Sequence, residues 1–419
     1  MKIVVFGKTL YAGVMSALLA ESGHQVYWCD HLAEDLNFED HFEDHLLKVM
    51  LIKQKRIGFL RQCDFDSLDT DIDAYWFCLG AYEEQQAIRL AQRLQQRHII
   101  HPKLIINTAT FGLYGTAQLQ NILNQDEWVY LPDNIREGKA LSSFTDAEQL
   151  VVGCDCQQTL SKVQELLRAL FPQPQQYICM PILDAEFSKL SVSGMLGARI
   201  SFINDLATVA EKIGVDIQHV RASMAADPRI GGNYLFPGIG FGGENFSHDI
   251  LTLTRAVADA GGRSRLLEQV WQINEEQKEL LFRKLWAYFH GELNGKTIAI
   301  WGAAYKENTA SIHQSAIHPM LAALWAQGAV IRLHDPAALQ SIASMYGERE
   351  DLILCEQQYD AISDAHALCV LTPWRQYWSL DYRQLVNRMQ HPLLLDGRNM
   401  YHPEYVKNQG LAYIGVGRQ

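Results

Sequence analysis

The chain has 419 residues, 48% of them hydrophobic and 20% charged, and a formal net charge of -12 at pH 7. These values are typical of a globular protein of two or three domains, and the negative charge argues against nucleic acid or an anionic membrane as the main partner. No apolar run approaches the ~18 residues of a transmembrane helix. No small-residue cleavage site follows the apolar start at 1–7, so we expect a cytoplasmic protein.

The N-terminal part alternates strand-like and helix-like segments. Helical periodicity covers 10–22, and the strand-like runs lie at 2–6, 25–29, 74–79, 104–107, 128–131 and 150–152. Strands that alternate with helices predict a parallel, doubly wound sheet.

The segment 30–45 carries seven acids and three histidines. His41 and His45 are one helical turn apart, which is a spacing that a metal site can use. A solvated amphipathic helix with Leu36, Phe42 and Leu46 facing inward explains the pattern better, so we predict no metal there.

The middle of the chain predicts a helical region. One long helix is expected from 185 to 215, and Gly194 and Gly197 inside it indicate close helix packing, for which a second subunit is one partner. A second α/β unit begins at Lys296, with a helix at 319–327 and strands at 297–301, 330–334, 352–354, 367–371 and 393–395.

The predicted architecture is therefore α/β, with two Rossmann-like doubly wound domains joined by a central helical dimerisation region. The expected boundaries are 1–180, 181–290 and 291–419. A ligand is expected in a cleft between such domains.

The eight cysteines mostly lie in apolar, strand-like runs, as Cys78 and Cys369 do. They are interpreted as small core residues in a reducing compartment. Cys154 and Cys156 are too close together for a usual zinc clip, so no metal site is predicted for them.

Three segments carry a resemblance to a known family. Residues 131–138 read Leu-Pro-Asp-Asn-Ile-Arg-Glu-Gly, 229–231 and 236–243 contain Arg-Ile-Gly and Phe-Pro-Gly-Ile-Gly-Phe-Gly-Gly, and 396–401 read Asp-Gly-Arg-Asn-Met-Tyr. Together with the helical segment 200–205, they resemble the UDP-glucose/GDP-mannose dehydrogenases in order and spacing from Lys2 to Arg418. The resemblance implies NAD as cofactor, a nucleotide sugar as substrate and a homodimer.

The cofactor loop departs from the family's Gly-x-Gly-x-x-Gly, because its three positions are Gly7, Thr9 and Ala12. Ala12 is small enough to pack. The branched side chain of Thr9 stands where phosphate oxygens would lie and disfavours a positive φ, although its hydroxyl is a possible phosphate donor. Asp30 either accepts from the NAD ribose or is a solvated acid at a strand end. These changes, with Leu79-Gly80-Ala81-Tyr82 in place of Val-Gly-Thr-Pro, argue against ordinary NAD binding.

The catalytic cysteine of the family is missing. The family oxidises a sugar alcohol to a carboxylate in two hydride transfers through a cysteine thioester, and its Gly-Gly-x-Cys-x-x-Lys-Asp reads here as 242–249 with Asn245 at the cysteine position. A carboxamide forms no thioester. None of the eight cysteines aligns as a substitute, although sequence alone leaves room for one to reach in.

Other catalytic positions are kept or replaced conservatively. The resemblance assigns oxyanion stabilisation to Lys189, a hydrogen bond to Ser193 in place of Asn, and water binding to Thr108. Asp133 stands for the family's Glu, one methylene shorter, and Asp249 is retained. His248 replaces a lysine, which makes it either a new acid/base or, as we favour, a neutral substitution.

The remaining candidates concern the nucleotide sugar. The resemblance gives the substrate loop the contacts Phe236, Gly238, Gly240, Gly242 and Gly243, although a tight structural loop is an alternative reading. Arg229 is a substrate contact or an interface residue. Lys306 and Arg398 are candidates for phosphate and sugar. His313 stands where the family has an arginine.

Two functions follow from this pattern. The leading one is a nucleotide-sugar dehydrogenase-like protein with NAD-linked alcohol oxidation but without the thioester step, or with other chemistry on a related substrate. The alternative is an inactive homologue that acts as a ligand-binding, regulatory or scaffold protein.

Overall fold

A computed structural model describes residues 1–29, 42–68, 71–97, 104–109, 111–124 and 127–418. The chain divides into two compact units, Met1–Val192 and Ser193–Gln419, and the helix α8 (Ile182–Ile213) contributes to both. Asp30, Leu36 and His41 lie outside the described residues. Among the described ones nearby, Phe42 is buried against Trp28, as predicted, whereas Leu46 is 69% exposed.

The first unit is built on a sheet with the strand order β3-β2-β1-β4-β5-β6-β7-β8. All neighbours are parallel except β6 and β7, which are antiparallel. The strands are β1 Lys2–Phe6, β2 Gln25–Cys29, β3 Leu60–Cys63, β4 Ala74–Phe77, β5 Leu104–Asn107, β6 Trp128–Tyr130, β7 Leu150–Gly153 and β8 Tyr177–Met180. The described helices are α1 Leu10–Glu21, α3 His45–Ile57, α4 Glu84–Gln96, α5 Gly115–Leu123, α6 Ala140–Thr145, α7 Gln157–Leu166 and the start of α8.

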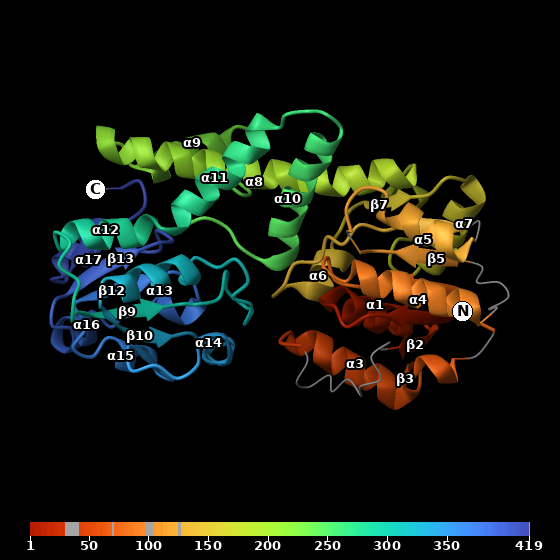
Figure 1. The fold of residues 1–419 in the computed structure, drawn as a ribbon, viewed down its shortest axis with the longest axis horizontal. Coiled ribbons are helices and arrows are strands. Elements are labelled where there is room, and N and C mark those ends of the chain that lie inside the picture. Colours follow the sequence, from red (N-terminus) through yellow and green to blue (C-terminus); the bar gives the residue numbers. More distant parts are fainter. Residues whose placement is uncertain (30–41, 69–70, 98–103, 110, 125–126, 419) are drawn as a thin grey trace. The chain divides into compact units, whose positions relative to one another are not determined.

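The central strands of this sheet are buried on both faces, which is why they read as continuous apolar runs. Successive residues of β1 enter different cores: Ile3 and Val5 pack under α1, while Val4 and Phe6 pack under α4 and α5. Figure 1 shows the helices α1, α4 and α5 of this unit. The predicted doubly wound sheet is confirmed, with one antiparallel pair that was not foreseen.

The second unit has a parallel sheet with the order β11-β10-β9-β12-β13-β14. Its strands are β9 Thr297–Trp301, β10 Val330–His334, β11 Leu352–Leu354, β12 Ala367–Val370, β13 Leu393–Asp396 and β14 Ala412–Ile414. Its described helices, besides α8, are α9 Ile217–Ala226, α10 Glu244–Asp259, α11 Arg265–Lys278, α12 Leu280–Tyr288, α13 Ile317–Ala326, α14 Leu339–Tyr346, α15 Gln358–Ala361, α16 Tyr382–Arg388 and α17 Pro403–Asn408. In both sheets the order reverses beside the first strand, which places a topological switch point there.

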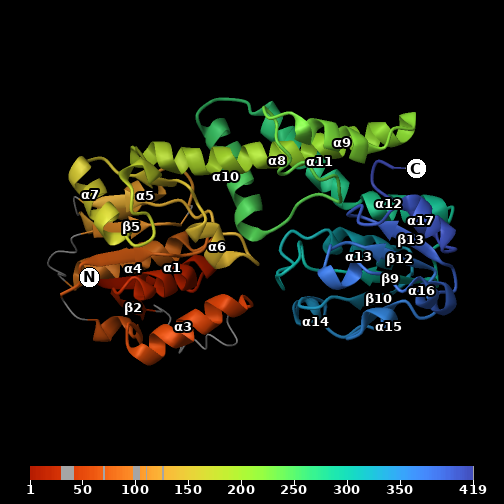
Figure 2. The same cartoon turned by 180° about the vertical axis from the view of Figure 1, so that it is seen from behind.

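The two glycines inside α8 mark a close crossing with α10, which Figure 2 shows from behind. A Cβ on Gly194 would lie 2.9 Å from Leu253, and one on Gly197 would lie 2.6 Å from Ile250. The predicted close helix packing is therefore confirmed, and its partner is a helix of the same chain.

Candidate functional site

The loop after β1 begins with a glycine that the fold requires. Gly7 has φ +111°, and a Cβ there would lie 2.2 Å from the carbonyl oxygen of Cys78. No side chain fits this approach, so Gly7 joins β1 to α1 whether or not a cofactor binds.

Thr9 is the N-cap of α1, with φ -67° and ψ 161°. Its hydroxyl accepts from the amide of Ala12 at 3.1 Å and donates its proton to the Cys78 carbonyl at 2.8 Å. The expected conflict with a positive φ does not arise, because the φ of Thr9 is negative. The hydroxyl was also offered as a phosphate donor, but its one proton is already donated to the Cys78 carbonyl, so this expectation is corrected as well. The amide of Ala12, in the first turn of α1, is thus capped by the chain itself.

Polar groups gather at the carboxyl edge of β1, β4, β5 and β6. Thr108 donates its hydroxyl proton to the carbonyl of Phe77 at 2.9 Å, and Asp133 accepts from the amide of Ile135 at 2.9 Å. Tyr11 is 2% exposed, its hydroxyl has no partner in the described part of the chain, and burial raises its pKa, with Cys78 and Asp133 adding to the effect. The resemblance supplied Thr108 and Asp133, but Tyr11 was missed because it lies in an otherwise apolar helix.

Glu186 anchors the beginning of α8, three residues before Lys189. The Glu186 carboxylate is 3% exposed and accepts from the amides of Tyr114 and Thr116, both at 2.8 Å, at the start of α5. Lys189 is also buried, at 8% exposure. Sequence reasoning missed Glu186, which fixes the segment that carries the predicted catalytic lysine.

We expect Glu186→Ala to lower the free energy of unfolding by about 2 kcal/mol, because two backbone amides, of which that of Thr116 is buried, lose their acceptor. Glu186→Gln tests the charge. Burial raises the pKa of Glu186 above 4.5, and the amide hydrogen bonds offset this shift only in part. The contribution of this carboxyl group to the stability of the protein is therefore complete below pH 4.5 and is lost as pH rises through the folded-state pKa. The stability of the wild type relative to Glu186→Gln should therefore fall from pH 4 towards neutrality in urea titrations.

The matched control is Asp184→Asn, which removes an exposed acid from the same helical turn. Because the side chain is exposed, this substitution should change the free energy of unfolding by no more than about 0.5 kcal/mol. A stability difference for Glu186→Gln that is constant across the same pH range would contradict the assignment.

Asn245, which the sequence analysis places at the family's cysteine position, lies on the first turn of α10. Gly243, with φ +95°, is the N-cap, and Asn245 is the second helical residue and is exposed. One turn further, Asp249 is 1% exposed and its carboxylate accepts from the hydroxyl of Ser193 at 2.7 Å. The fold therefore brings two of the predicted catalytic residues, Ser193 and Asp249, into direct contact.

Five of the eight cysteines are buried, Cys63 is partly exposed, and two are exposed. Burial raises the pKa of the thiols of Cys78 and Cys369, which disfavours their thiolate forms. Cys156 and Cys179 are exposed, which corrects the expectation of core cysteines at these two positions.

The glycine-rich loop 236–243 is held by side-chain amides of α8 and α11. Asn204 accepts from the amide of Gly238 at 2.8 Å, and Gln277 donates to the Gly238 carbonyl at 2.7 Å. Asn274 accepts from the amide of Phe241 at 2.7 Å and donates to its carbonyl at 3.1 Å. The loop is thus rigidly positioned before any ligand arrives.

The loop glycines pack against the protein. An added Cβ would lie 2.8 Å from Asn274 at Gly240, 2.6 Å from the Gln314 carbonyl at Gly242 and 2.9 Å from Tyr305 at Gly243. Internal packing accounts for these three glycines, and a Cβ on Gly238 would also be close, 3.2 Å from the carbonyl of Gly397. By contrast, Phe236 is 62% exposed, and the guanidinium of Arg221 lies 3.6 Å from its ring centroid.

The three predicted basic contacts have different surroundings. Arg398 donates to the carbonyls of Leu371, Gly240 and Tyr305 at 2.6, 3.4 and 3.3 Å, and burial lowers its pKa to about 10. In this structure it joins the loop 236–243 to the segments that follow β9 and β12 of the second sheet. The Lys306 ammonium lies 5.4 Å from the centroid of the Tyr305 ring, and Arg229 is exposed and paired with Asp227 at 2.6 Å.

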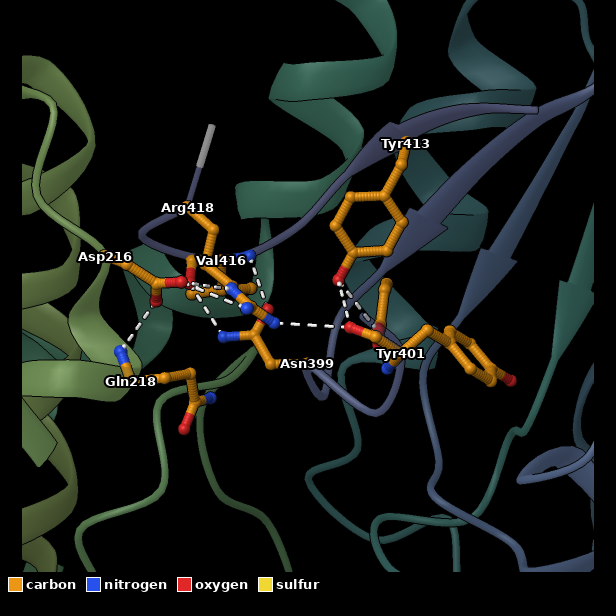
Figure 3. Close-up of polar contacts among 8 residues, drawn as sticks. Asp216, Gln218, Asn399, Tyr401, Tyr413, Val416 and Arg418 are labelled. Atoms are coloured by element: carbon orange, nitrogen blue, oxygen red, sulfur yellow. Dashed lines mark hydrogen bonds and ion pairs between the residues drawn. The ribbon is translucent and has the colours of Figure 1, made fainter. Parts of the chain in front are cut away.

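The Asp-Gly-Arg-Asn motif at 396–399 makes polar contacts near the end of the chain, where Figure 3 shows Asn399, Tyr401, Tyr413 and Val416. Asp396 is fully buried and accepts from the amide of Tyr401 and the hydroxyl of Tyr413, both at 3.0 Å. Asn399, with φ +52°, exchanges two hydrogen bonds with the backbone of Val416. Arg418 then pairs with Asp216 at the start of α9 at 3.0 Å.

Comparison with known families decides the relationship. Residues 183–276 match the central domain of the UDP-glucose/GDP-mannose dehydrogenase family, and residues 299–403 match its UDP binding domain. The chain belongs to the UDP-glucose/GDP-mannose dehydrogenase family. As a member of this nucleotide-sugar dehydrogenase family, it places Lys189, Ser193 and Asp249 in the segment that matches the central domain.

Individual relatives agree with this membership. The chain is 34% identical to a UDP-glucose 6-dehydrogenase of Pseudomonas aeruginosa over 68% of its own length and 64% of the relative's. It is 27% identical to the UDP-glucose 6-dehydrogenase TuaD of Bacillus subtilis over 100% and 93% of the two chains. The alignment with the first of these relatives thus spans less than two thirds of that relative's length.

Solved structures show the same fold. A UDP-glucose dehydrogenase from Pyrobaculum islandicum superposes with a TM-score of 0.86 at 22% identity and covers 100% of this chain and 98% of the other. A UDP-D-ManNAc dehydrogenase from Pyrococcus horikoshii gives a TM-score of 0.83 at 18% identity, with 100% and 99% covered. Within the described ranges, no helix is long and apolar enough to cross a membrane, and no cluster of side chains is suited to a metal ion.

Proposed function

We propose that this member of the family binds a nucleotide sugar and does not oxidise it through a cysteine thioester. The observation that carries the proposal is Asn245, which stands exposed at the second residue of α10, where the family's cysteine aligns. A carboxamide there can donate and accept hydrogen bonds, but it cannot capture an aldehyde.

Ligand binding is supported by the UDP binding domain match and by relatives whose names specify UDP-sugars. The loop 236–243, fixed by Asn204, Asn274 and Gln277, supplies a preorganised backbone, and Phe236 supplies an exposed aromatic surface of the kind on which a base or sugar ring packs. We infer that a UDP-sugar is the ligand class, with GDP-sugars as the comparison.

NAD is the cofactor that the family resemblance implies, and it would accept a hydride. The residues at α1 do not fit its pyrophosphate, because the Thr9 hydroxyl holds the amide of Ala12. We therefore propose that wild-type binding of NAD is weak.

A second candidate is an enzyme that oxidises the sugar alcohol with NAD but stops before the thioester. The buried contact between Ser193 and Asp249 favours it, because an acid held at 2.7 Å by a hydroxyl, one turn from Asn245, can accept or return a proton. Lys189 would stabilise negative charge on the sugar oxygen.

A thermal-shift panel with UDP-glucose, UDP-glucuronate, GDP-mannose, NAD, NADH and NADP separates the candidates. A ligand at about 100 times its dissociation constant stabilises by roughly 2.7 kcal/mol, which shifts a melting curve measurably. We expect a shift with UDP-sugars and none with the dinucleotides. A shift with NAD would favour the second candidate, and silence with every nucleotide sugar would refute both.

We also propose that two copies of the chain pair through α8 and α11. These helices line a groove of about 420 Å³ in the second unit. Its rim carries exposed apolar side chains, with Met195 65%, Phe202 51% and Leu266 69% exposed. Exposed apolar surface of this kind marks an interaction site, and the family resemblance names a second copy as its occupant.

We expect Leu266→Glu to weaken dimerisation at least about tenfold, because a two-fold interface places the buried charge in it twice. Analytical ultracentrifugation should show a dimer for the wild type and for Met345→Glu, a control on the equally exposed face of α14. A wild-type monomer, or a Leu266→Glu dimer of unchanged affinity, would refute this interface.

A further inference from the structure

Two cysteines meet where β7 and β8 end, in the first unit. Cys154 directly follows β7, and its amide donates to the carbonyl of Met180 at 2.9 Å, while Cys179 lies within β8. Their sulfur atoms are 3.4 Å apart. Cys154 is 4% exposed, whereas Cys179 is exposed. The pair thus presents one sulfur to solvent and keeps its partner sheltered beside it.

We propose that Cys154 and Cys179 form a reversible dithiol site, which small disulfides such as oxidised glutathione convert into an intramolecular disulfide. The exposed Cys179, as its thiolate, attacks one sulfur of the small disulfide, which forms a mixed disulfide and releases one small thiolate. Cys154 then loses its proton and attacks the Cys179 sulfur, which releases the second small thiol. The protein dithiol is oxidised by two electrons, and one small disulfide is reduced to two thiols.

The division of roles follows from the surroundings of the two sulfurs. Cys179 is the exposed residue of the pair and is therefore the one that an incoming disulfide reaches first, whereas Cys154 is buried. Burial raises the pKa of Cys154 to about 12, and its contact with Cys179 adds to this, so it remains a thiol until the mixed disulfide lies beside it. The buried thiol therefore acts second.

Cys156 is the natural competitor, because it is exposed and lies two residues from Cys154. Its sulfur is engaged elsewhere: it caps α7, where it lies 3.0 Å from the Thr159 hydroxyl and 3.5 Å from the Thr159 amide. These contacts turn it towards its own helix, so Cys156 is expected to remain outside the disulfide.

Closing the pair would tie together two segments that support α8. Cys179 is three residues before Ile182, where α8 begins, and a Cβ on Gly153 would lie 2.8 Å from Ala185 in its first turn. A cross-link between residues 25 apart restricts the unfolded chain, so the oxidised protein should unfold at a higher temperature than the reduced one. This effect does not depend on nucleotide-sugar binding.

The test oxidises the full chain with oxidised glutathione, alkylates the remaining thiols in denaturant and measures intact mass. The wild type and the matched control Cys156→Ser should each lose two alkylatable thiols and regain them after reduction. In both proteins the disulfide should join the peptide 140–162, which contains Cys154, to the peptide 169–189, which contains Cys179. Cys179→Ser, which changes an exposed residue, should form no intramolecular disulfide. Cys154→Ser should retain one glutathione at Cys179.

Three results would overturn the proposal. A disulfide that persists in Cys179→Ser would show a link between Cys154 and Cys156. Loss of the disulfide in Cys156→Ser would assign the chemistry to Cys156. A wild type that carries only glutathione adducts, with no increase in melting temperature, would show that the two sulfurs do not join.

Discussion

Replacing Thr9 with glycine should lower the dissociation constant for NAD about 10- to 100-fold. The substitution removes the hydroxyl that holds the amide of Ala12, so that this amide becomes available to a pyrophosphate oxygen at the N-terminus of α1. A hydrogen bond to a charged group contributes about 1.5–3 kcal/mol, which corresponds to this range of affinity. Isothermal titration with NAD measures it directly.

Thr9→Ser is the matched control, because serine keeps both the cap to Ala12 and the hydrogen bond to the Cys78 carbonyl. Its NAD affinity should equal that of the wild type. Equal affinities for all three proteins would mean that the cap is no obstacle, and the interpretation of the loop would then be wrong.

The second large effect is expected from Asn245→Cys. A thiol on the first turn of α10 is close to the positive end of the helix, which lowers a cysteine pKa below its usual value of about 8.5. The introduced thiol should therefore react with iodoacetamide rapidly at neutral pH. Oxidation of UDP-glucose to the acid should reappear only when Thr9→Gly is combined with it, at a rate of the order of 10²-fold or more above either single variant.

Asn245→Ser supplies the control for Asn245→Cys, since a hydroxyl at the same place forms no thioester under these conditions. Acid formation by Asn245→Cys alone would show that Thr9 does not limit cofactor use. A silent double variant would place a further loss elsewhere, for which His313, at the family's arginine position, is the first residue to restore.

The fold was predictable where burial dominates the sequence. The runs 2–6 and 297–301 are apolar because both faces of a central parallel strand are covered, and each became a central strand. The strands β3, β8 and β14 were missed. They lie at sheet edges or carry mixed sequences such as Leu-Arg-Gln-Cys, where pairing with a neighbour, rather than an apolar pattern, decides the conformation.

The site was less predictable, because several of its side chains form hydrogen bonds with backbone groups that lie far away in the sequence. Glu186 caps a helix that begins about 70 residues earlier, and Arg398 donates to carbonyls from three separate loops. Such contacts leave no periodic signal. The role of Thr9 was predictable in principle, because a threonine just before an apolar helix is a standard N-cap. Comparison with the Gly-x-Gly-x-x-Gly pattern pointed only to the size of its branched side chain.

The most direct measurement incubates the wild-type chain with UDP-glucose and NAD, follows NADH and identifies the sugar product by mass spectrometry. We expect the nucleotide sugar to be bound and to be recovered without conversion to the uronate. Formation of the uronate, with two NADH for each sugar oxidised, would show that the chain completes the family reaction without its cysteine and would contradict the proposed function.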